Sequence, residues 1–335
     1  MNELFQHLPD DVRGQLKETE QPEWVDPMLA TLTGRRFSDP GWIFERKLDG
    51  ERCITYRNGD DVRLMSRNQH RLNVQYPELV EALAGQSVKH FIVDGEVVAF
   101  EGDLTSFSRL QDRMNIEDVQ EARRSSVAVY YYIFDLLYFD GYDVMAVPLR
   151  HRKWLLKQGL SYADPMRYTT HRNEEGEAFF REACEKGWEG IIAKQAGAPY
   201  VHARSKTWLK FKCVAQQEFV IGGYADPHGE RIGFGALLLG YYDGEKLKYA
   251  GKVGTGFDNE TLQRLSEKLA KLEQDSPPFV NGDLPHKEVH WVRPELVAEI
   301  GFEEWTEYDR LRQPRFLGLR QDKDAKDVVK EEPQG

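Results

Sequence analysis

The segment Glu45 to Arg52 reads E-R-K-L-D-G-E-R and contains a lysine that could act as a nucleophile. Lys47 stands at the end of an apolar stretch, directly before an Asp-Gly turn. A lysine amine becomes nucleophilic when its pKa falls, and burial beside cations such as Arg52 and Lys212 would lower it. Asp49 could orient the amine. A lysine before an Asp-Gly hairpin is also often an ordinary surface residue, so this segment needs support from the rest of the chain.

Four further short strings follow in chain order: D-G-E at 94–96, F-D-L-L at 134–137, E-G-I-I-A-K at 189–194 and W-L-K-F-K at 208–212. Lys210 and Lys212 alternate on one strand face, which suits contact with a phosphate. Glu96 and Glu189 offer the hard oxygen ligands that Mg²⁺ prefers. The alternatives are structural: Phe134 as sheet core, and either carboxylate as an ion-pair partner.

The elements around these strings indicate an α+β fold. Residues 42–65 form short β-rich runs broken by the turn signals D-G and N-G-D-D, which predicts antiparallel strands and hairpins. Residues 77–85 have helical spacing, and 91–100 return to strand character. The stretch 174–194 reads as an amphipathic helix, a glycine stop and then a strand. No regular alternation of strands and helices is present.

The residue pattern changes after Lys212. From there on, it predicts short strands with glycine-rich turns and one helix over 258–273. That pattern suits a small β-barrel, of which the oligonucleotide-binding (OB) fold is the commonest kind. We therefore predict an N-terminal extension at 1–22 with little core of its own, a first domain at 23–214, a barrel domain at 215–323 and a disordered tail at 324–335.

Charge and cysteine content limit the possible classes of function. The formal net charge of −11 argues mildly against a nucleic-acid partner. Basic residues nevertheless crowd one segment and predict a local basic surface, with a plain solvated face as the alternative. These residues are Arg46, Lys47, Arg52, Arg57, Arg63, Arg67 and Arg71.

The three cysteines lie far apart, so neither a structural zinc nor a disulfide is expected. No signal peptide or membrane span is visible, which indicates a cytoplasmic protein.

Taken in order, the five strings resemble the motifs of the covalent nucleotidyltransferases, which comprise ATP-dependent DNA ligases, RNA ligases and mRNA capping enzymes. Near the C-terminus, R-F-L-G-L-R-Q-D-K ends in Arg320, Asp322 and Lys323 and resembles the R-x-D-K motif of ATP-dependent DNA ligases. Two segments, W-V-R-P-E-L-V-A-E-I and R-F-L-G-L-R, look most similar to the ligase module of bacterial ligase D. The resemblance spans roughly Trp24 to Lys323.

The resemblance implies a fold and a role for each matched residue. The fold would be an adenylation domain of antiparallel sheets with flanking helices, followed by an OB-fold barrel. Lys47 would take AMP from ATP. The other implied contacts are Lys210 and Lys212 with the α-phosphate, Phe134 and Glu45 with adenine, Arg52 and Arg67 with ribose and substrate phosphate, Glu189 and Glu96 with Mg²⁺ (Glu96 also with ribose), and Arg320, Asp322 and Lys323 with the leaving pyrophosphate.

The implied activity is sealing of 5′-phosphate/3′-hydroxyl breaks in DNA, in repair or end joining. ATP would be the AMP donor and Mg²⁺ the metal, with Mn²⁺ as a substitute. Nicked or broken double-stranded DNA would be the substrate, Ku and a separate repair polymerase would be partners, and the enzyme would be a nucleoid-associated monomer. The alternatives are an RNA ligase or capping-type enzyme, and a non-catalytic module that binds DNA ends.

Overall fold

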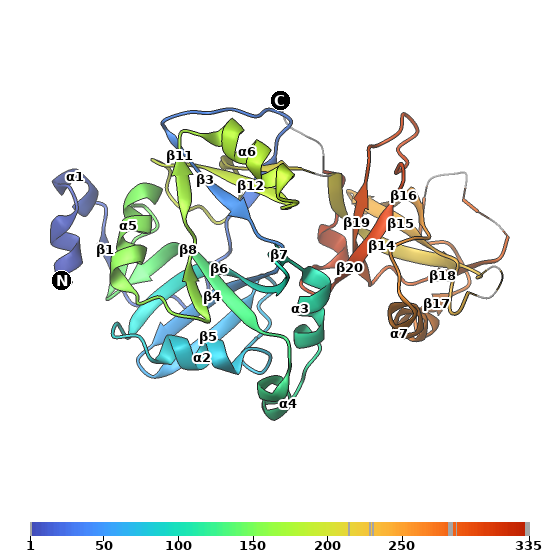
Figure 1. The fold of residues 1–335 in the computed structure, drawn as a ribbon, viewed down its shortest axis with the longest axis horizontal. Helices are drawn as coiled ribbons and strands as arrows, with labels where there is room; N and C mark the ends of the chain where they lie inside the picture. Colours follow the sequence, from blue (N-terminus) through green and yellow to red (C-terminus); the bar gives the residue numbers. More distant parts are fainter. Residues whose placement is uncertain are drawn as a thin grey trace. The chain divides into compact units, whose positions relative to one another are not determined.

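Two β-sheets packed face to face dominate the first of two units, which the chain forms up to Cys213. The structure is a computed structural model, and it describes residues 2–213, 215–227, 229, 231–280, 284–285 and 287–331. The second unit follows Cys213. Figure 1 shows the elements of each unit.

The first sheet is mainly antiparallel and has the strand order β1-β9-β8-β6-β4-β5, with β7 beside β6 and β10 parallel to β8. Its strands are β1 (Lys17–Glu18), β4 (Glu51–Asn58), β5 (Asp61–Ser66), β6 (His90–Glu101), β7 (Leu104–Thr105), β8 (Val129–Phe139), β9 (Tyr142–Asp143) and β10 (Met166–Tyr168).

The second sheet has the order β11-β3-β12-β13-β2. Its strands are β2 (Leu29–Leu32), β3 (Trp42–Lys47), β11 (His171–Asn173), β12 (Gly190–Gln195) and β13 (Arg204–Lys212). Side chains of a strand alternate between faces. On β4, Ile54 and Tyr56 therefore pack between the sheets with Trp208, whereas Cys53 enters the core on the opposite face.

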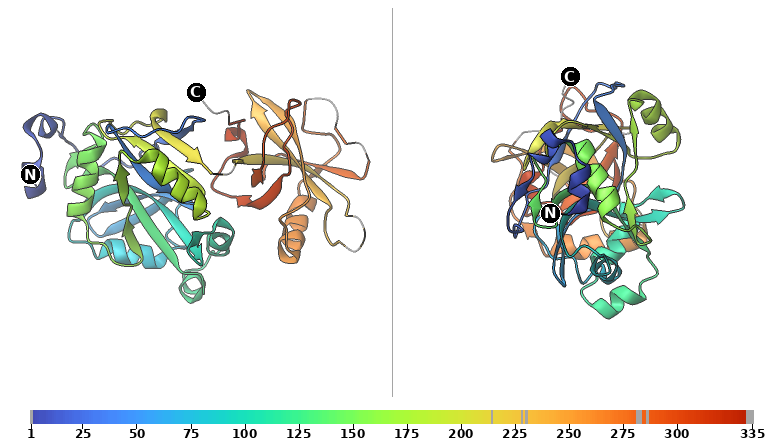
Figure 2. Two further views of the ribbon diagram at one scale, coloured as in Figure 1. Left: turned by 45° about the horizontal axis from the view of Figure 1, so that its top comes forward. Right: turned by 90° about the vertical axis from the view of Figure 1, so that its left-hand side faces the viewer.

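Helices cover the outer face of each sheet (Figures 1 and 2). On the first sheet, α2 (Pro77–Ala84) packs against β5, α3 (Phe107–Met114) against β6 and α5 (Leu149–Gly159) against β8, while α4 (Val119–Arg124) contacts α2. On the second sheet, α6 (Gly176–Glu185) packs against β12. The larger unit is therefore layered, with helices outside and two sheets inside.

The N-terminal segment contributes more to the core than the sequence suggested. It forms the 3₁₀-helix η1 (Glu3–His7) and the short helix α1 (Asp10–Arg13). Phe5, Leu8 and Val12 are buried in the core of the first sheet, and Phe5 meets the ring of Phe139 edge to face. The expectation of little core in residues 1–22 is wrong, because these three apolar side chains fall on one face of the segment.

The second unit is a curled sheet. Its strands are β14 (Ala215–Ala225), β15 (Ala236–Asp243), β16 (Lys246–Val253), β17 (Glu273–Gln274), β18 (Val289–Val292), β19 (Val297–Phe302) and β20 (Arg315–Arg320). The long strand β14 pairs with β15 along one edge and with β19 and β18 along the other. Helix α7 (Asn259–Ala270) begins at the capping side chain of Asp258 and lies where a helix was predicted.

Residues 324–331 are ordered, so the predicted disordered tail is wrong for this stretch; 332–335 lie outside the described residues. The 3₁₀-helix η2 (Ala325–Asp327) is followed by Val328, and Ala325 and Val328 are both buried in the core of the second unit. The Gln217 side chain also donates a hydrogen bond to the Val329 carbonyl, 2.9 Å away. Apolar contacts thus hold a segment whose composition is mostly charged.

A disulfide joins Cys184 and Cys213, whose Cα atoms are 5.3 Å apart, and the expectation of no disulfide is therefore wrong. Cys184 lies in the last turn of α6, and Cys213 directly follows β13. Because α6 packs on β12, which pairs with β13, the fold brings together residues that are 29 positions apart. Within the described residues, no three His, Cys, Asp or Glu side chains are grouped in a way that could hold a metal.

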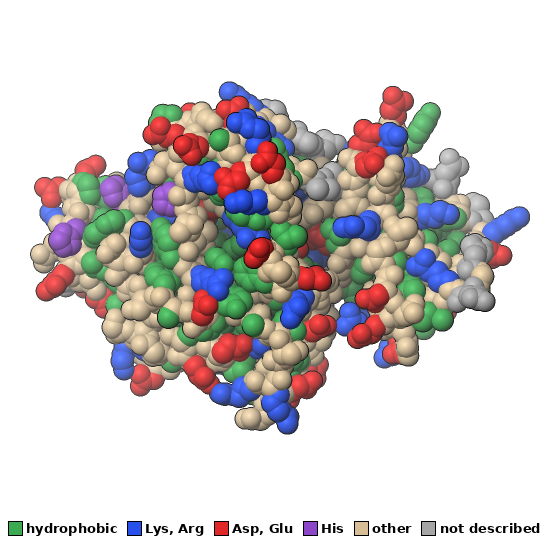
Figure 3. Space-filling model, viewed as in Figure 1, with side chains coloured by type: hydrophobic (Ala, Val, Ile, Leu, Met, Phe, Trp, Pro, Cys, Tyr) green, Lys and Arg blue, Asp and Glu red, His purple; other side chains and the backbone are tan. Residues whose placement is uncertain are grey.

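Two arginines of the basic segment 46–71 do not contribute to the predicted basic surface. Arg57 is buried and donates to the carbonyls of Leu83, Gln86 and Val88, and Arg52 is paired with Asp94. On the face drawn in Figure 3, the described lysine and arginine side chains are interspersed with aspartate and glutamate. Every helix in the described parts of the chain is too short or too polar to span a bilayer.

Candidate active site

Lys47 ends β3 and lies against Glu189, the residue just before β12. Its Nζ atom is 2.6 Å from a Glu189 carboxylate oxygen, and the Lys47 side chain is 22% exposed. The contact follows from strand pairing, because Lys47 is opposite Gly190 in the antiparallel register of β3 and β12. The predicted nucleophile is thus held beside a buried carboxylate while still accessible.

Lys210 and Lys212 belong to the same face of this sheet. Lys210 is opposite Ile192 and Lys212 opposite Gly190 on β12, and directly opposed residues share a face. Burial alone would raise the pKa of Glu189, but the charges of Lys47, Lys212 and Lys210 lower it. The carboxylate therefore stays ionised within a group of three lysines. Three lysines around one carboxylate leave an excess of positive charge, which can stabilise a further anion.

A buried charge network lies further along the same face. Glu45 is almost fully buried and forms ion pairs with Lys153 of α5 and with Lys194 of β12, the latter at 2.7 Å. Burial would raise the pKa of Glu45, whereas these two lysines lower it. Lys153 also donates to the Thr169 carbonyl, 2.9 Å away. Glu45, predicted to accept from adenine, is thus already paired through both oxygens.

Phe134 lies where the two sheets meet. Its ring contacts Trp208 edge to face, with centroids 6.0 Å apart, and two cations lie over it: Lys194 at 4.1 Å and Arg52 at 4.7 Å from the centroid. Only 9% of Phe134 is exposed. The ring therefore belongs both to the inter-sheet core and to the wall of the site.

Arg52 is anchored by a bidentate ion pair. Its Nη2 atom donates to Asp94, 2.6 Å away, and to the Met28 carbonyl, and Tyr200 also donates to Asp94. Burial would lower the pKa of Arg52, but Asp94 raises it strongly. Glu96 is opposite Arg52 in the register of β4 and β6.

The remaining predicted residues of the first unit lie in loops near these strands. Arg67 directly follows β5. Asp49 lies in the turn between β3 and β4, where its backbone N–H donates to the Thr105 hydroxyl, 3.2 Å away.

Arg320, Asp322 and Lys323 belong to the second unit and are paired within it. Arg320 donates to Glu299 at 2.8 Å and to both oxygens of Asp322. Lys323 is 3.0 Å from Glu218. These cations are therefore held by neighbouring carboxylates, and their charges are partly neutralised.

Lys153 and Arg152 are functional candidates that sequence reasoning missed. Arg152 is fully buried and paired with Asp135, 2.7 Å away, and Lys153 binds Glu45. A signal was available, because Leu149, Arg152 and Leu156 of α5 follow helical spacing and place charged residues on the buried face. Buried cations on an apolar helix face require carboxylate partners.

Family models describe nearly the whole chain. The model "ATP dependent DNA ligase domain" matches residues 27–212, and "ATP dependent DNA ligase C terminal region" matches residues 230–323. The chain belongs to the ATP-dependent DNA ligases. Its fold is accordingly an adenylation domain followed by an OB-fold domain, as predicted, and the capping-enzyme, RNA-ligase and non-catalytic alternatives are set aside.

Individual relatives of this ligase agree with the family models. The "Multifunctional non-homologous end joining protein LigD" of Pseudomonas aeruginosa is 37% identical over 95% of this chain, which spans 38% of that relative. "DNA ligase 2" of Thermofilum pendens is 34% identical, covering 82% of this chain and 50% of the relative. The solved structure of a "mycobacterial DNA ligase D complexed with ATP and MES" has a TM-score of 0.66 at 34% identity, covering 92% of this chain and 98% of that one. This chain thus spans less than half of the LigD relative.

Proposed function

We propose that this ligase seals 5′-phosphate/3′-hydroxyl breaks in DNA through an AMP adduct on Lys47. The observation that carries the proposal is the position of Lys47, a partly exposed amine 2.6 Å from Glu189. Lys210 and Lys212 share its sheet face. A nucleophile next to an ionised carboxylate and two further cations suits attack on a phosphorus atom that carries several negative oxygens.

Three displacements make up the proposed cycle. The Lys47 Nζ atom loses a proton and attacks the α-phosphorus of ATP, and the bond to pyrophosphate breaks. An oxygen of the DNA 5′-phosphate then attacks the same phosphorus, which breaks the phosphorus–nitrogen bond and transfers AMP to DNA. Finally the 3′-hydroxyl attacks the DNA phosphorus, AMP leaves, and the strand is closed. Each step exchanges one phosphorus bond for another, so positioning and charge stabilisation supply most of the catalysis.

The other predicted residues are assigned to substrate contacts. Phe134 would stack on adenine and Glu45 would accept from its amino group, which is supported by their position at the junction of the sheets. Arg52 and Arg67 would contact ribose and substrate phosphate, and Asp49 would orient the Lys47 amine. Arg320, Asp322 and Lys323 would assist departure of pyrophosphate, because cations stabilise the charge of this leaving anion.

We further propose that Mg²⁺, or Mn²⁺ in its place, accompanies ATP. The buried carboxylate of Glu189 is a suitable hard ligand, and Glu96 would be the second. The described residues contain no cluster of three potential ligands. Mg²⁺ usually keeps several waters and binds through one or two carboxylates and the substrate phosphates, so the proposal needs only Glu189 and Glu96. The metal would supply charge neutralisation at the phosphates.

The physiological proposal is end joining in the bacterial nucleoid, as a monomer assisted by Ku and a separate repair polymerase. The support is the name of the Pseudomonas aeruginosa relative, a non-homologous end joining protein. A test is ligation of linear DNA with and without Ku. Joining at equal rates in both reactions would remove Ku from the proposal and leave nick sealing intact.

The sealing activity is tested by adenylation and chase. Purified protein, freed of AMP, is incubated with α-labelled ATP and Mg²⁺ and then given nicked DNA in a single turnover. We expect protein-bound label to disappear as sealed strands accumulate. Glu185→Ala, at the exposed last residue of α6, is the control and should behave like wild type. Persistence of the label with no sealing would contradict the proposal.

A further inference from the structure

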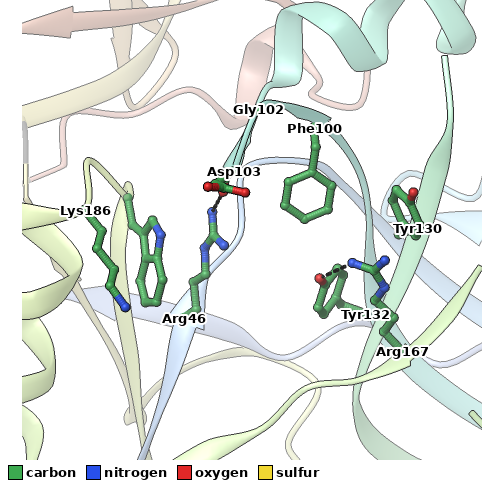
Figure 4. A pocket seen from close by; sticks show the side chains of 9 residues that line it. Arg46, Phe100, Gly102, Asp103, Tyr130, Tyr132, Arg167 and Lys186 are labelled. Atoms are coloured by element: carbon green, nitrogen blue, oxygen red, sulfur yellow. Dashed lines mark hydrogen bonds between the residues drawn. The ribbon is translucent and has the colours of Figure 1, made fainter. Parts of the chain in front are cut away.

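A pocket of about 630 Å³ in the first unit has the composition of a nucleotide-binding site (Figure 4). One wall consists of Arg46 from β3 and of Lys186 and Trp188 from the turn between α6 and β12. The facing wall comes from the first sheet and consists of Phe100, Tyr130, Tyr132 and Arg167, and the turn at Gly102 and Asp103 closes one side. Three cations and four aromatic rings thus surround a single carboxylate.

The pocket is adjacent to the proposed nucleophile along two chain segments. Arg46 directly precedes Lys47, and Trp188 directly precedes Glu189. The Arg46 guanidinium lies 4.4 Å from the centroid of the Trp188 ring, so the two segments are in contact here as they are at the Lys47–Glu189 pair. The pocket is therefore lined by residues next to Lys47 and Glu189 in the chain, although neighbouring side chains of a strand point to opposite faces.

Arg46 has unused capacity to bind an anion. Arg167 is bound to Asp164 and Lys186 to Glu182. For Arg46, by contrast, no carboxylate lies within ion-pair distance among the described residues; it makes one long contact of 3.4 Å to the Asp103 carbonyl, and its buried Nε atom has no hydrogen-bond partner there. A phosphate oxygen would supply the missing acceptor.

The facing wall suits a base. Phe100 and Tyr130 meet edge to face with centroids 5.6 Å apart, and the Arg167 guanidinium lies 3.9 Å from the centroid of the Tyr130 ring. Aromatic rings and guanidinium planes bind the faces of unpaired bases with little regard for sequence. Bases within a duplex are stacked on each other and cannot present their faces in this way, so duplex DNA would offer only phosphates here.

From this geometry we infer that the pocket binds one unpaired nucleotide of single-stranded DNA next to the break, such as a nucleotide of an overhang. The inference rests on the proposed function, because it takes DNA as the substrate. In this arrangement Arg46 binds a phosphate of the nucleotide, and the base lies against the wall formed by Phe100 and Tyr130. It adds a preference for ends that carry an overhang, which the Lys47 chemistry alone does not require.

The test compares two DNA ends by fluorescence anisotropy, a blunt duplex and the same duplex with a short overhang. We expect the full chain to bind the overhang more tightly. The double variant Tyr130→Leu/Arg167→Gln should lose roughly 10-fold or more in affinity for the overhang, since stacking of one base is worth about 1–3 kcal/mol. Its affinity for the blunt duplex and its adenylation should stay within about twofold of wild type. Arg181→Gln, an exposed arginine on α6, is the matched control.

Lys186→Gln is a second variant for the case that the double variant does not fold. It replaces an exposed side chain, and we expect it to keep the native fold. It should show a smaller loss, confined to the overhang. Three outcomes would each overturn the inference. Wild type could bind the blunt and overhang ends equally, or the double variant could lose affinity equally for both. A free mononucleotide could also compete for binding as effectively as the overhang does. Adenylation is measured separately, so failure of the Lys47 chemistry would be recognised independently of the pocket.

Discussion

Lys153 holds together the buried charges next to the proposed adenine site. It pairs with Glu45 and donates to the Thr169 carbonyl, and its side chain is 1% exposed. Its removal leaves Glu45 paired with Lys194 alone and takes a donor from the buried Thr169 carbonyl, and an unsatisfied buried acceptor costs about 1–3 kcal/mol. We therefore expect Lys153→Met to lower the free energy of unfolding by about that amount in urea titrations.

Lys186→Met is the matched control for Lys153→Met. Lys186 pairs with Glu182 at the surface, where such a pair contributes about 0–1 kcal/mol. Similar losses from both variants would mean that the Glu45 network contributes no more than a surface pair.

His171 should make stability depend on pH. Burial, together with the charge of Lys153, lowers its pKa from 6.5 to about 4. The unfolded chain therefore binds more protons than the native protein between these pH values, so stability is complete above about pH 6.5 and falls as pH decreases toward 4. Thermal melting against pH should show this loss. A His171→Gln variant should show a flatter profile over this range, and an unchanged slope would contradict the assignment.

At the scale of elements, strand alternation explains why much of the site was predictable. Glu45 and Lys47 on β3, Lys194 on β12, and Lys210 and Lys212 on β13 all fall on one face of one sheet. Period-two spacing in the sequence is enough to group residues within each strand. The burial of Arg57 was not predictable in this way, because its partners are carbonyls at the end of α2 and beyond it.

The disulfide was missed for a related reason, since it depends on how α6 packs against the second sheet. It closes a separation of 29 residues, for which loop entropy predicts a contribution of about 3–4 kcal/mol. We expect a reductant to lower the melting temperature of the wild-type protein, and Cys184→Ser to melt at the reduced value whether or not a reductant is present. A wild-type melting temperature that does not respond to full reduction would contradict a stabilising role.

At the scale of the whole molecule, we propose that the second unit contributes to only one step of the cycle, the adenylation of Lys47. Lys323 belongs to the second unit and is expected to act only when pyrophosphate leaves. We expect Lys323→Gln to slow adenylation by roughly 100-fold, as loss of a charge-stabilising contact does. Sealing of a nick that already carries AMP should be unaffected.

Lys326→Gln is the control for Lys323→Gln. Lys326 is a lysine of the same unit and lies over the ring of Tyr242. If Lys323→Gln slowed both steps equally, the second unit would not have the step-specific role proposed for it.

The central claim, that Lys47 carries AMP, is tested most directly by mapping the adduct. The full chain is incubated with ATP and Mg²⁺, digested under conditions that preserve the phosphorus–nitrogen bond, and analysed by mass spectrometry. We predict one AMP on the peptide that contains Lys47, and none on any peptide of Lys47→Arg. An adduct on a different lysine, or an adduct that persists in Lys47→Arg, would contradict the account.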